Sequence, residues 1–202
     1  MLALVKYGTG PRETELREVP VPEIGDDDLL IEVKAAGICG SDIAYDNGDH
    51  PNHLNCPVVL GHEFSGVVSK VGKNVTEWKV GDRVVSDNTG YVCGKCHACT
   101  TGQYLMCPER LGLGYGMDGG FTDYVKIRGD LLSRNPNALF HIPDNVSFDE
   151  AAILDPICNA YKAVVQESSI LPGEDIAVFG VGPLGLFSIQ IARVMGCGNI
   201  IA

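Results

Sequence analysis

The chain has few basic residues for its size and no apolar run long enough to span a bilayer. Its 202 residues include 15 lysines and arginines against 26 aspartates and glutamates, a formal net charge of −11. That charge repels nucleic-acid phosphates and anionic membrane surfaces, so neither is expected as a partner. Internal repeats and low-complexity stretches are also missing, and the length then allows one domain or a small pair.

No secretory leader is expected either, because the opening residues MLALVKYGTG contain no charged stretch followed by an apolar one. A disulfide framework, which suits small secreted chains, is therefore a poor interpretation of the eight cysteines. With 45% hydrophobic and 20% charged residues, the composition is typical of a soluble protein. Thiols that serve a metal are best kept in a reducing compartment, which favours the cytoplasm.

Four cysteines lie together in the segment VCGKCHACTTGQYLMC, with the spacing C-x2-C-x2-C-x7-C. They are Cys93, Cys96, Cys99 and Cys107. Turn-forming glycines within the segment let four thiolates converge on a tetrahedral Zn²⁺. Four protein ligands leave no open position, so this zinc is expected to be structural.

An iron–sulfur cluster is the competing interpretation of this loop, because its first spacings and the Cys107-Pro108 pair also occur in ferredoxin runs. Ferredoxin runs place the fourth thiolate after three residues, however, and here the gap is seven. The loop is also polar, with Lys95, His97 and Gln103, where a cluster needs an apolar surrounding. The spacing therefore favours zinc.

Up to about Pro143 the sequence predicts short strands separated by turns, because glycine and proline interrupt it too often for long helices. The expected strands are Leu2–Tyr7, Leu29–Ala35, Val58–Val71, Arg83–Ser86 and Phe121–Ile127. Near Ser147 the pattern changes to helix-forming residues with apolar positions at helical spacing. We therefore expect one domain over residues 1–150 and a second over 151–202.

The second segment predicts a strand, a glycine turn and a helix, which is how a dinucleotide-binding fold begins. Gly180, Gly182 and Gly185 form G-x-G-x-x-G directly after the run Ile176–Phe179, which is expected to be buried. Such glycines let backbone amides approach a pyrophosphate, and the helix after Pro183 would point its positive end at that anion. The candidate cofactor-binding residues are Gly180, Gly182, Pro183, Leu184 and Gly185.

The chain ends at Ala202, midway along what should be the second strand of that fold, so the sequence is interpreted as truncated. The acidic residue that would hold the ribose is expected at the end of this strand. NAD and NADP therefore both remain open.

Two further motifs, GICGSD at Gly37–Asp42 and GHEFSG at Gly61–Gly66, precede the four-cysteine loop and the glycine turn. In this order, the four motifs resemble the zinc-containing medium-chain alcohol dehydrogenases, in particular the sorbitol and threonine dehydrogenase branch. The resemblance covers essentially the whole chain. It implies a β-rich GroES-like catalytic domain followed by the start of an α/β Rossmann domain. It also implies a second, catalytic zinc in the cleft between the domains, and a homo-oligomer for the full-length protein.

By the same resemblance, Cys39 and His62 are the thiolate and imidazole ligands of the catalytic zinc, and Glu63 is the carboxylate beside it. Ser41 matches the hydroxyl that contacts the substrate oxygen, and Asp42 a carboxylate that orients the ligating histidine. Each also has an ordinary structural interpretation, such as a buried cysteine or a core histidine. The occurrence of all of them in the family's order outweighs those separate interpretations.

Asp155, in ILDPICNAY, resembles the further ligand of the polyol and threonine branch. It is equally well placed to cap a helix that starts at Pro156, and the two roles are compatible. The branch often has a histidine after the position of Ile43, where this chain has Ala44. His50 or His53 could replace it in a proton relay, although both are expected to be exposed loop residues.

The expected function is hydride transfer between NAD or NADP and a secondary alcohol, such as a polyol, cyclitol or hydroxy amino acid. The corresponding ketone is the other small-molecule partner. The alternative is a zinc-stabilised binding or scaffold module without catalysis.

Overall fold

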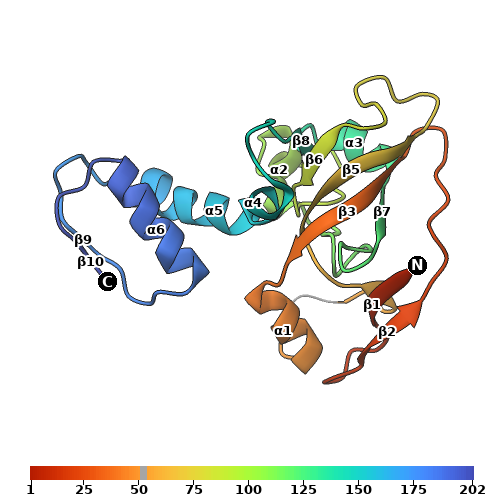
Figure 1. The fold of residues 1–202 in the computed structure, drawn as a ribbon, viewed down its shortest axis with the longest axis horizontal. Coiled ribbons are helices and arrows are strands. Elements are labelled where there is room, and N and C mark those ends of the chain that lie inside the picture. Colours follow the sequence, from red (N-terminus) through yellow and green to blue (C-terminus); the bar gives the residue numbers. More distant parts are fainter. Residues whose placement is uncertain (51–53) are drawn as a thin grey trace. The chain divides into compact units, whose positions relative to one another are not determined.

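The computed structural model describes residues 1–50 and 54–202, and these divide into two compact units, Met1–Ala152 and Ile153–Ala202. Each unit is described by itself (Figure 1). Within the described ranges, no helix is long and apolar enough to cross a membrane.

The first unit is built on a five-stranded antiparallel sheet with the order β7-β3-β5-β6-β8. Its strands are β3 (Leu29–Gly37), β5 (Glu63–Val71), β6 (Arg83–Ser86), β7 (Tyr124–Ile127) and β8 (Leu139–His141). Alternate apolar residues face one core, in which Leu29, Ile31, Phe64 and Val68 are almost fully buried. The short helix α4 (Phe148–Ala152) closes onto this sheet, where Ser65 Oγ donates to the Phe148 carbonyl at 2.7 Å.

A smaller antiparallel sheet, with the order β2-β1-β4, lies beside the N-terminus (Figure 1). It contains β1 (Leu2–Lys6), β2 (Thr14–Glu18) and β4 (Val58–Val59). The chain also forms α1 (Gly40–Asn47), α2 (His97–Thr100), the 3-10 turn η1 (Tyr104–Met106) and α3 (Gly129–Arg134).

Two of the expected strands differ in the structure. Val58–Val71 was expected as one strand, but β4 and β5 are separated around Gly61, whose φ of +91° is incompatible with an extended strand. The strand expected over Phe121–Ile127 begins only at Tyr124, because the residues before it form the turn that pairs with residues 59–61.

The second unit begins with α5 (Leu154–Tyr161), which continues as the π-helical segment η2 (Lys162–Glu167). It then forms a parallel β-α-β arrangement of β9 (Ile176–Ala177), α6 (Pro183–Val194) and β10 (Ile200–Ile201). Parallel strands joined through a helix are the repeating unit of a Rossmann sheet. The mixed fold class expected from the sequence is thus confirmed, although the run ending at Phe179 is not buried, since that side chain is 99% exposed.

Candidate metal centres

The three-donor centre forms where the end of β3, the start of α1 and the start of β5 meet. Cys39, His62 and Glu63 each offer one donor atom, and these atoms lie within 4.8 Å of one another. His62 and Glu63 are each only 6% exposed, whereas Cys39 is half-buried. A soft thiolate, an imidazole and a carboxylate in this arrangement suit Zn²⁺ and leave a tetrahedral position open.

The pairing of β3 with β5 explains how the Glu63 carboxylate reaches the three-donor centre. Gly37 and Glu63 are cross-strand partners at the ends of β3 and β5. A Cβ built on Gly37 would overlap Glu63 Oε2, so only glycine leaves room for the carboxylate there.

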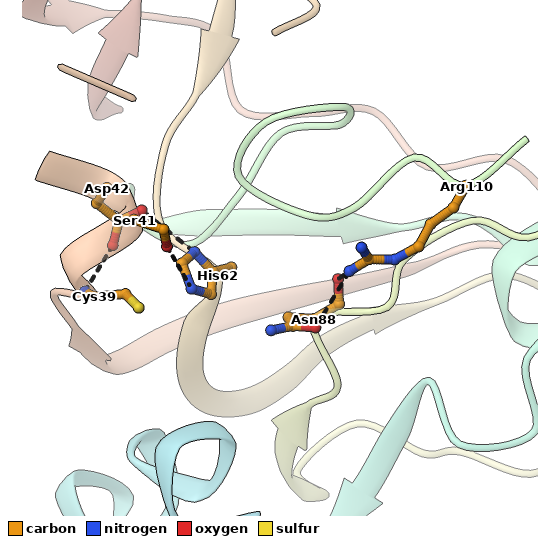
Figure 2. A network of polar contacts seen from close by, with 6 residues as sticks. All are labelled: Cys39, Ser41, Asp42, His62, Asn88 and Arg110. Carbon is orange, nitrogen blue, oxygen red and sulfur yellow. Dashed lines mark hydrogen bonds and ion pairs between the residues drawn. The ribbon is translucent and has the colours of Figure 1, made fainter. Parts of the chain in front are cut away.

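Asp42 connects the two elements that carry the donors (Figure 2). Its Oδ2 accepts the Cys39 backbone N–H at 2.8 Å, as expected of an acidic residue in the first turn of a helix. Its Oδ1 lies 3.3 Å from His62 Nδ1, an ion-pair distance without a well-directed hydrogen bond. The carboxylate therefore holds Nδ1 and leaves Nε2 available to a metal.

The contacts within this centre shift the pKa values of Cys39 and His62 in opposite directions. The contact with His62 lowers the pKa of Cys39, although burial opposes this. Burial lowers the pKa of His62, but Asp42 and Cys39 raise it, and the net value is about 10. A metal ion bound here would compete with protons for these donor atoms.

Ser41 lies next to the same imidazole (Figure 2). Its Oγ is 3.5 Å from His62 Nε2, at the limit of a hydrogen bond. The sequence also offers two histidines as alternatives for the proton relay. His50 stacks on Tyr45 of α1, with ring centroids 4.0 Å apart, and His53 lies outside the described residues.

The glycine-rich turn in the segment YGMDGGF holds the strand before His62 in place. The backbone N–H groups of Gly119, Gly120 and Phe121 donate to the carbonyls of residues 59, 61 and 60, at 2.7 to 2.9 Å. The repeated glycines in YGMDGGF were the sequence signal for this contact. The turn is therefore part of the support of the three-donor centre.

The four-cysteine centre forms as a separate, self-contained loop. The donor atoms of Cys93, Cys96, Cys99 and Cys107 lie within 4.8 Å of one another, and none of the four is in a disulfide. Backbone N–H groups of residues 95 and 96 lower the pKa of Cys93 to about 7, whereas burial raises that of Cys99 to about 12. Four convergent thiols fit a dication that would take all four as thiolates.

Arg110 connects the end of this loop to the segment after β6 through hydrogen bonds. Nothing in the sequence indicates this role. Arg110 Nε donates to the Thr89 carbonyl at 3.0 Å and its Nη2 to the Asn88 carbonyl at 3.3 Å. Figure 2 shows Asn88 and Arg110 together. No pattern in the sequence marks this arginine as a bridging residue.

The candidate cofactor residues lie on the turn before α6 and in its first turn. Gly182 is the N-cap and Pro183 the first residue of the helix. A Cβ on Gly185 would overlap the Gly180 carbonyl oxygen, whereas one on Gly182 would meet no atom within 4 Å. The close helix–strand approach at Gly185 and the open surface at Gly182 match the roles of glycines in a pyrophosphate turn.

Asp155 belongs to the second unit and is not brought into either of the two donor groups found among the described residues. The expectation that it caps a helix starting at Pro156 is wrong. Helix α5 begins at Leu154 with Ile153 as N-cap, so Asp155 lies within the first turn, where its Oδ2 accepts from Asn159 Nδ2 at 3.2 Å. Its role as a metal ligand stays a prediction.

Fold and centres together define a GroES-like unit with two candidate metal centres, and a dinucleotide-type β-α-β unit. The model of the alcohol dehydrogenase GroES-like domain matches residues 25–137, and the chain belongs to this family. This match, together with the similar proteins described next, confirms the resemblance to zinc-containing medium-chain dehydrogenases of the sorbitol and threonine branch.

Similar proteins agree with this assignment. The chain is 47% identical over 205 residues to the zinc-type alcohol dehydrogenase-like protein YdjL of Escherichia coli K12, and the match covers all of this chain and 57% of that protein. It is 40% identical over 204 residues to sorbitol dehydrogenase of Bacillus subtilis, covering all of this chain and 55% of the enzyme. A zinc-binding dehydrogenase from Sinorhizobium meliloti 1021, solved with NADP, superposes with a TM-score of 0.86 at 32% identity, covering 98% of this chain and 54% of that one. The chain thus spans about half the length of these relatives.

Proposed function

We propose that the intact protein is a zinc-dependent oxidoreductase that transfers a hydride between a secondary alcohol and NAD or NADP. The alcohol would be of polyol, cyclitol or hydroxy amino acid type. The observation that carries the proposal is the convergence of Cys39, His62 and Glu63 beside the hydroxyl of Ser41. Sorbitol dehydrogenase among the relatives supports the polyol class, and the NADP-bound relative supports the nicotinamide cofactor.

In this proposal Cys39, His62 and Glu63 hold a catalytic zinc, and the four cysteines hold a structural one. Zinc at the three-donor centre would supply Lewis acidity, which favours the deprotonated form of an alcohol. Asp42 keeps the His62 ring oriented through Nδ1. Ser41 Oγ, which lies 3.5 Å from His62 Nε2, would accept the proton that the alcohol loses and pass it towards solvent.

The cofactor would dock on the turn at Gly180–Gly182 and the start of α6. Backbone N–H groups at a helix N-terminus favour a pyrophosphate, and Gly182 leaves space for its approach. The cofactor and substrate supply the redox chemistry, and the protein supplies their placement. A homo-oligomer in the cytoplasm is part of the same proposal.

The deciding experiment is a panel of polyols, cyclitols and hydroxy amino acids, tested on the intact protein with NAD⁺ and NADP⁺ together with zinc analysis. Two zinc ions per chain and alcohol-dependent formation of reduced cofactor are expected. One zinc per chain and no turnover with any alcohol would instead indicate a zinc-stabilised binding module.

Asp155 is proposed as the further group at the catalytic zinc, on the strength of the family resemblance. Asp155→Ala should lower the zinc content from two ions towards one, while the four-cysteine centre stays filled. Asn159→Ala removes the amide that contacts Asp155 but keeps the carboxylate, and is the matched control. Unchanged zinc content in Asp155→Ala would remove this residue from the centre.

A further inference from the structure

A fully buried lysine lies beside the helix that carries part of the three-donor centre. Lys6, the last residue of β1, is 0% exposed. Its Nζ donates to the Gly10 carbonyl at 2.5 Å and to the Asp46 carbonyl at 3.1 Å. Within residues 1–50 and 54–202, no carboxylate forms an ion pair with this ammonium. Burial of an unpaired charge is costly, so the two carbonyls indicate what Lys6 stabilises.

The Asp46 carbonyl belongs to the last turn of α1, the negative end of that helix. The last carbonyls of a helix have no partner within it and need donors from elsewhere. The last turn of α1 has no basic residue of its own, and its C-cap Gly48 donates to the carbonyls of residues 44 and 45. The ammonium of Lys6 therefore supplies both a donor and the positive charge that this helix end lacks.

The loop between β1 and β2 packs closely against the same end of α1. The backbone N–H of Arg12 also donates to the Asp46 carbonyl, at 2.6 Å. A Cβ built on Gly48 would lie only 3.2 Å from the Thr9 carbonyl oxygen and 3.3 Å from the Pro11 nitrogen. Lys6 therefore joins three segments, since its own strand, the loop at Gly10 and the end of α1 meet at one ammonium.

The opposite end of α1 carries groups of the three-donor centre. Cys39 is its N-cap, and Asp42 in its first turn contacts the imidazole of the centre. Midway along the helix, Tyr45 is 2% exposed and stacks on Tyr115, with ring centroids 5.4 Å apart. A helix of eight residues is only about 12 Å long and depends on tertiary contacts for its position. Loss of the Lys6 contact should therefore let α1 turn about Tyr45 and shift its first turn.

We propose that Lys6 is a positioning residue for the three-donor centre. Its ammonium fixes the last turn of α1, and through this helix it fixes the direction in which Cys39 and Ser41 face the metal. The proposal rests on the proposed function, because it requires a metal ion at that centre. The alternative is that Lys6 only stabilises the β1–β2 hairpin through Gly10, which predicts lower stability without any change at the metal.

The test uses the intact protein with zinc in the four-cysteine centre and cobalt in the three-donor centre, because the visible absorption of cobalt reports the geometry of its ligands. Lys6→Met keeps the length of the side chain and removes its charge and N–H donors. Its cobalt spectrum should differ from that of the parent. A chelator should remove this cobalt at about 3- to 10-fold lower strength than from the parent. Lys6→Gln, which stays polar but is shorter and uncharged, should change both measurements in the same direction.

Val5→Ala is the matched control, because Val5 lies in the same strand, is 5% exposed and packs in an apolar cluster that contains no residue of α1. It should lower the melting temperature but leave the cobalt spectrum and affinity as in the parent. Parent-like cobalt binding in both Lys6 variants, or an equal change in Val5→Ala, would overturn the proposal. Loss of zinc from the four-cysteine centre in both Lys6 variants would also overturn it, because Lys6 would then support the whole fold. A parent that binds no metal at the three-donor centre would refute the proposed function, and this proposal with it.

Discussion

The strongest prediction concerns Asp42, because this carboxylate contacts both halves of the three-donor centre. Asp42→Asn keeps the shape of the side chain and an oxygen that can accept the Cys39 N–H, but it removes the charge that faces His62 Nδ1 at 3.3 Å. Loss of a carboxylate that orients a metal-bound histidine typically costs about 10- to 100-fold in metal affinity. This corresponds to about 1.4 to 2.8 kcal/mol.

The assay is competition for zinc between the intact protein and a chelator of known affinity, with zinc per chain counted at each chelator concentration. Asp42→Asn should release one of its two zinc ions at about 10- to 100-fold lower chelator strength than the parent. The ion in the four-cysteine centre should be released as before. Asp49→Asn, which removes the same charge from an exposed position just beyond α1, is the control.

Equal zinc retention by Asp42→Asn and the parent would refute the reasoning, because it would mean that the Asp42–His62 contact does not stabilise the bound metal. Parallel loss of both ions would also contradict it, since general unfolding would then be the cause. A thermal unfolding curve for each variant separates these two results.

Three further predictions follow from the same geometry. Gly185→Ala should destabilise the second unit, because the new Cβ meets the Gly180 carbonyl. Gly182→Ala should fold normally and weaken only cofactor binding, because a Cβ there meets no atom within 4 Å. Melting curves measure the first effect and NADH titration measures the second. Cys107→Ser should lower the zinc content by one ion and lower the melting temperature, since it removes a ligand of a closed structural site. An unchanged melting temperature would contradict this prediction. His62, with a pKa of about 10 before metal binds, must lose a proton to become a ligand. Zinc affinity at its centre should therefore rise about tenfold per pH unit as pH increases towards 10, and a flat profile in pH-corrected chelator competition would argue against it.

Local sequence patterns predicted the elements whose own residues determine them. Arg83–Ser86 is a strand in the structure as expected, and the glycine turn leads into a helix that starts at Pro183. Strand β2 was missed, because TELRE has too little apolar character to indicate a strand. Its stability comes from pairing along its whole length with β1, a contact that the local sequence does not encode.

The candidate sites show the same division. The four-cysteine centre could be read from spacing, because one loop supplies every donor. The three-donor centre required the family resemblance, since Cys39 and His62 meet only through the pairing of β3 with β5. The repeated glycines mark the turn at Gly119–Phe121 in the sequence, but its partners do not follow from them, because the contact depends on backbone hydrogen bonds to residues 59–61.

The two centres therefore depend on the fold in opposite ways. Local turns bring the ligands of the four-cysteine loop together, so this metal site can form before the sheet is complete. The three-donor centre exists only when the end of β3, the start of α1 and the start of β5 are already in register. A local change in the loop should then affect stability first, whereas a change in the β3–β5 register should empty the three-donor centre while the four-cysteine centre remains filled. This difference follows from where in the chain the ligands come from, since one loop supplies the four thiolates whereas separate elements supply the thiolate, the imidazole and the carboxylate.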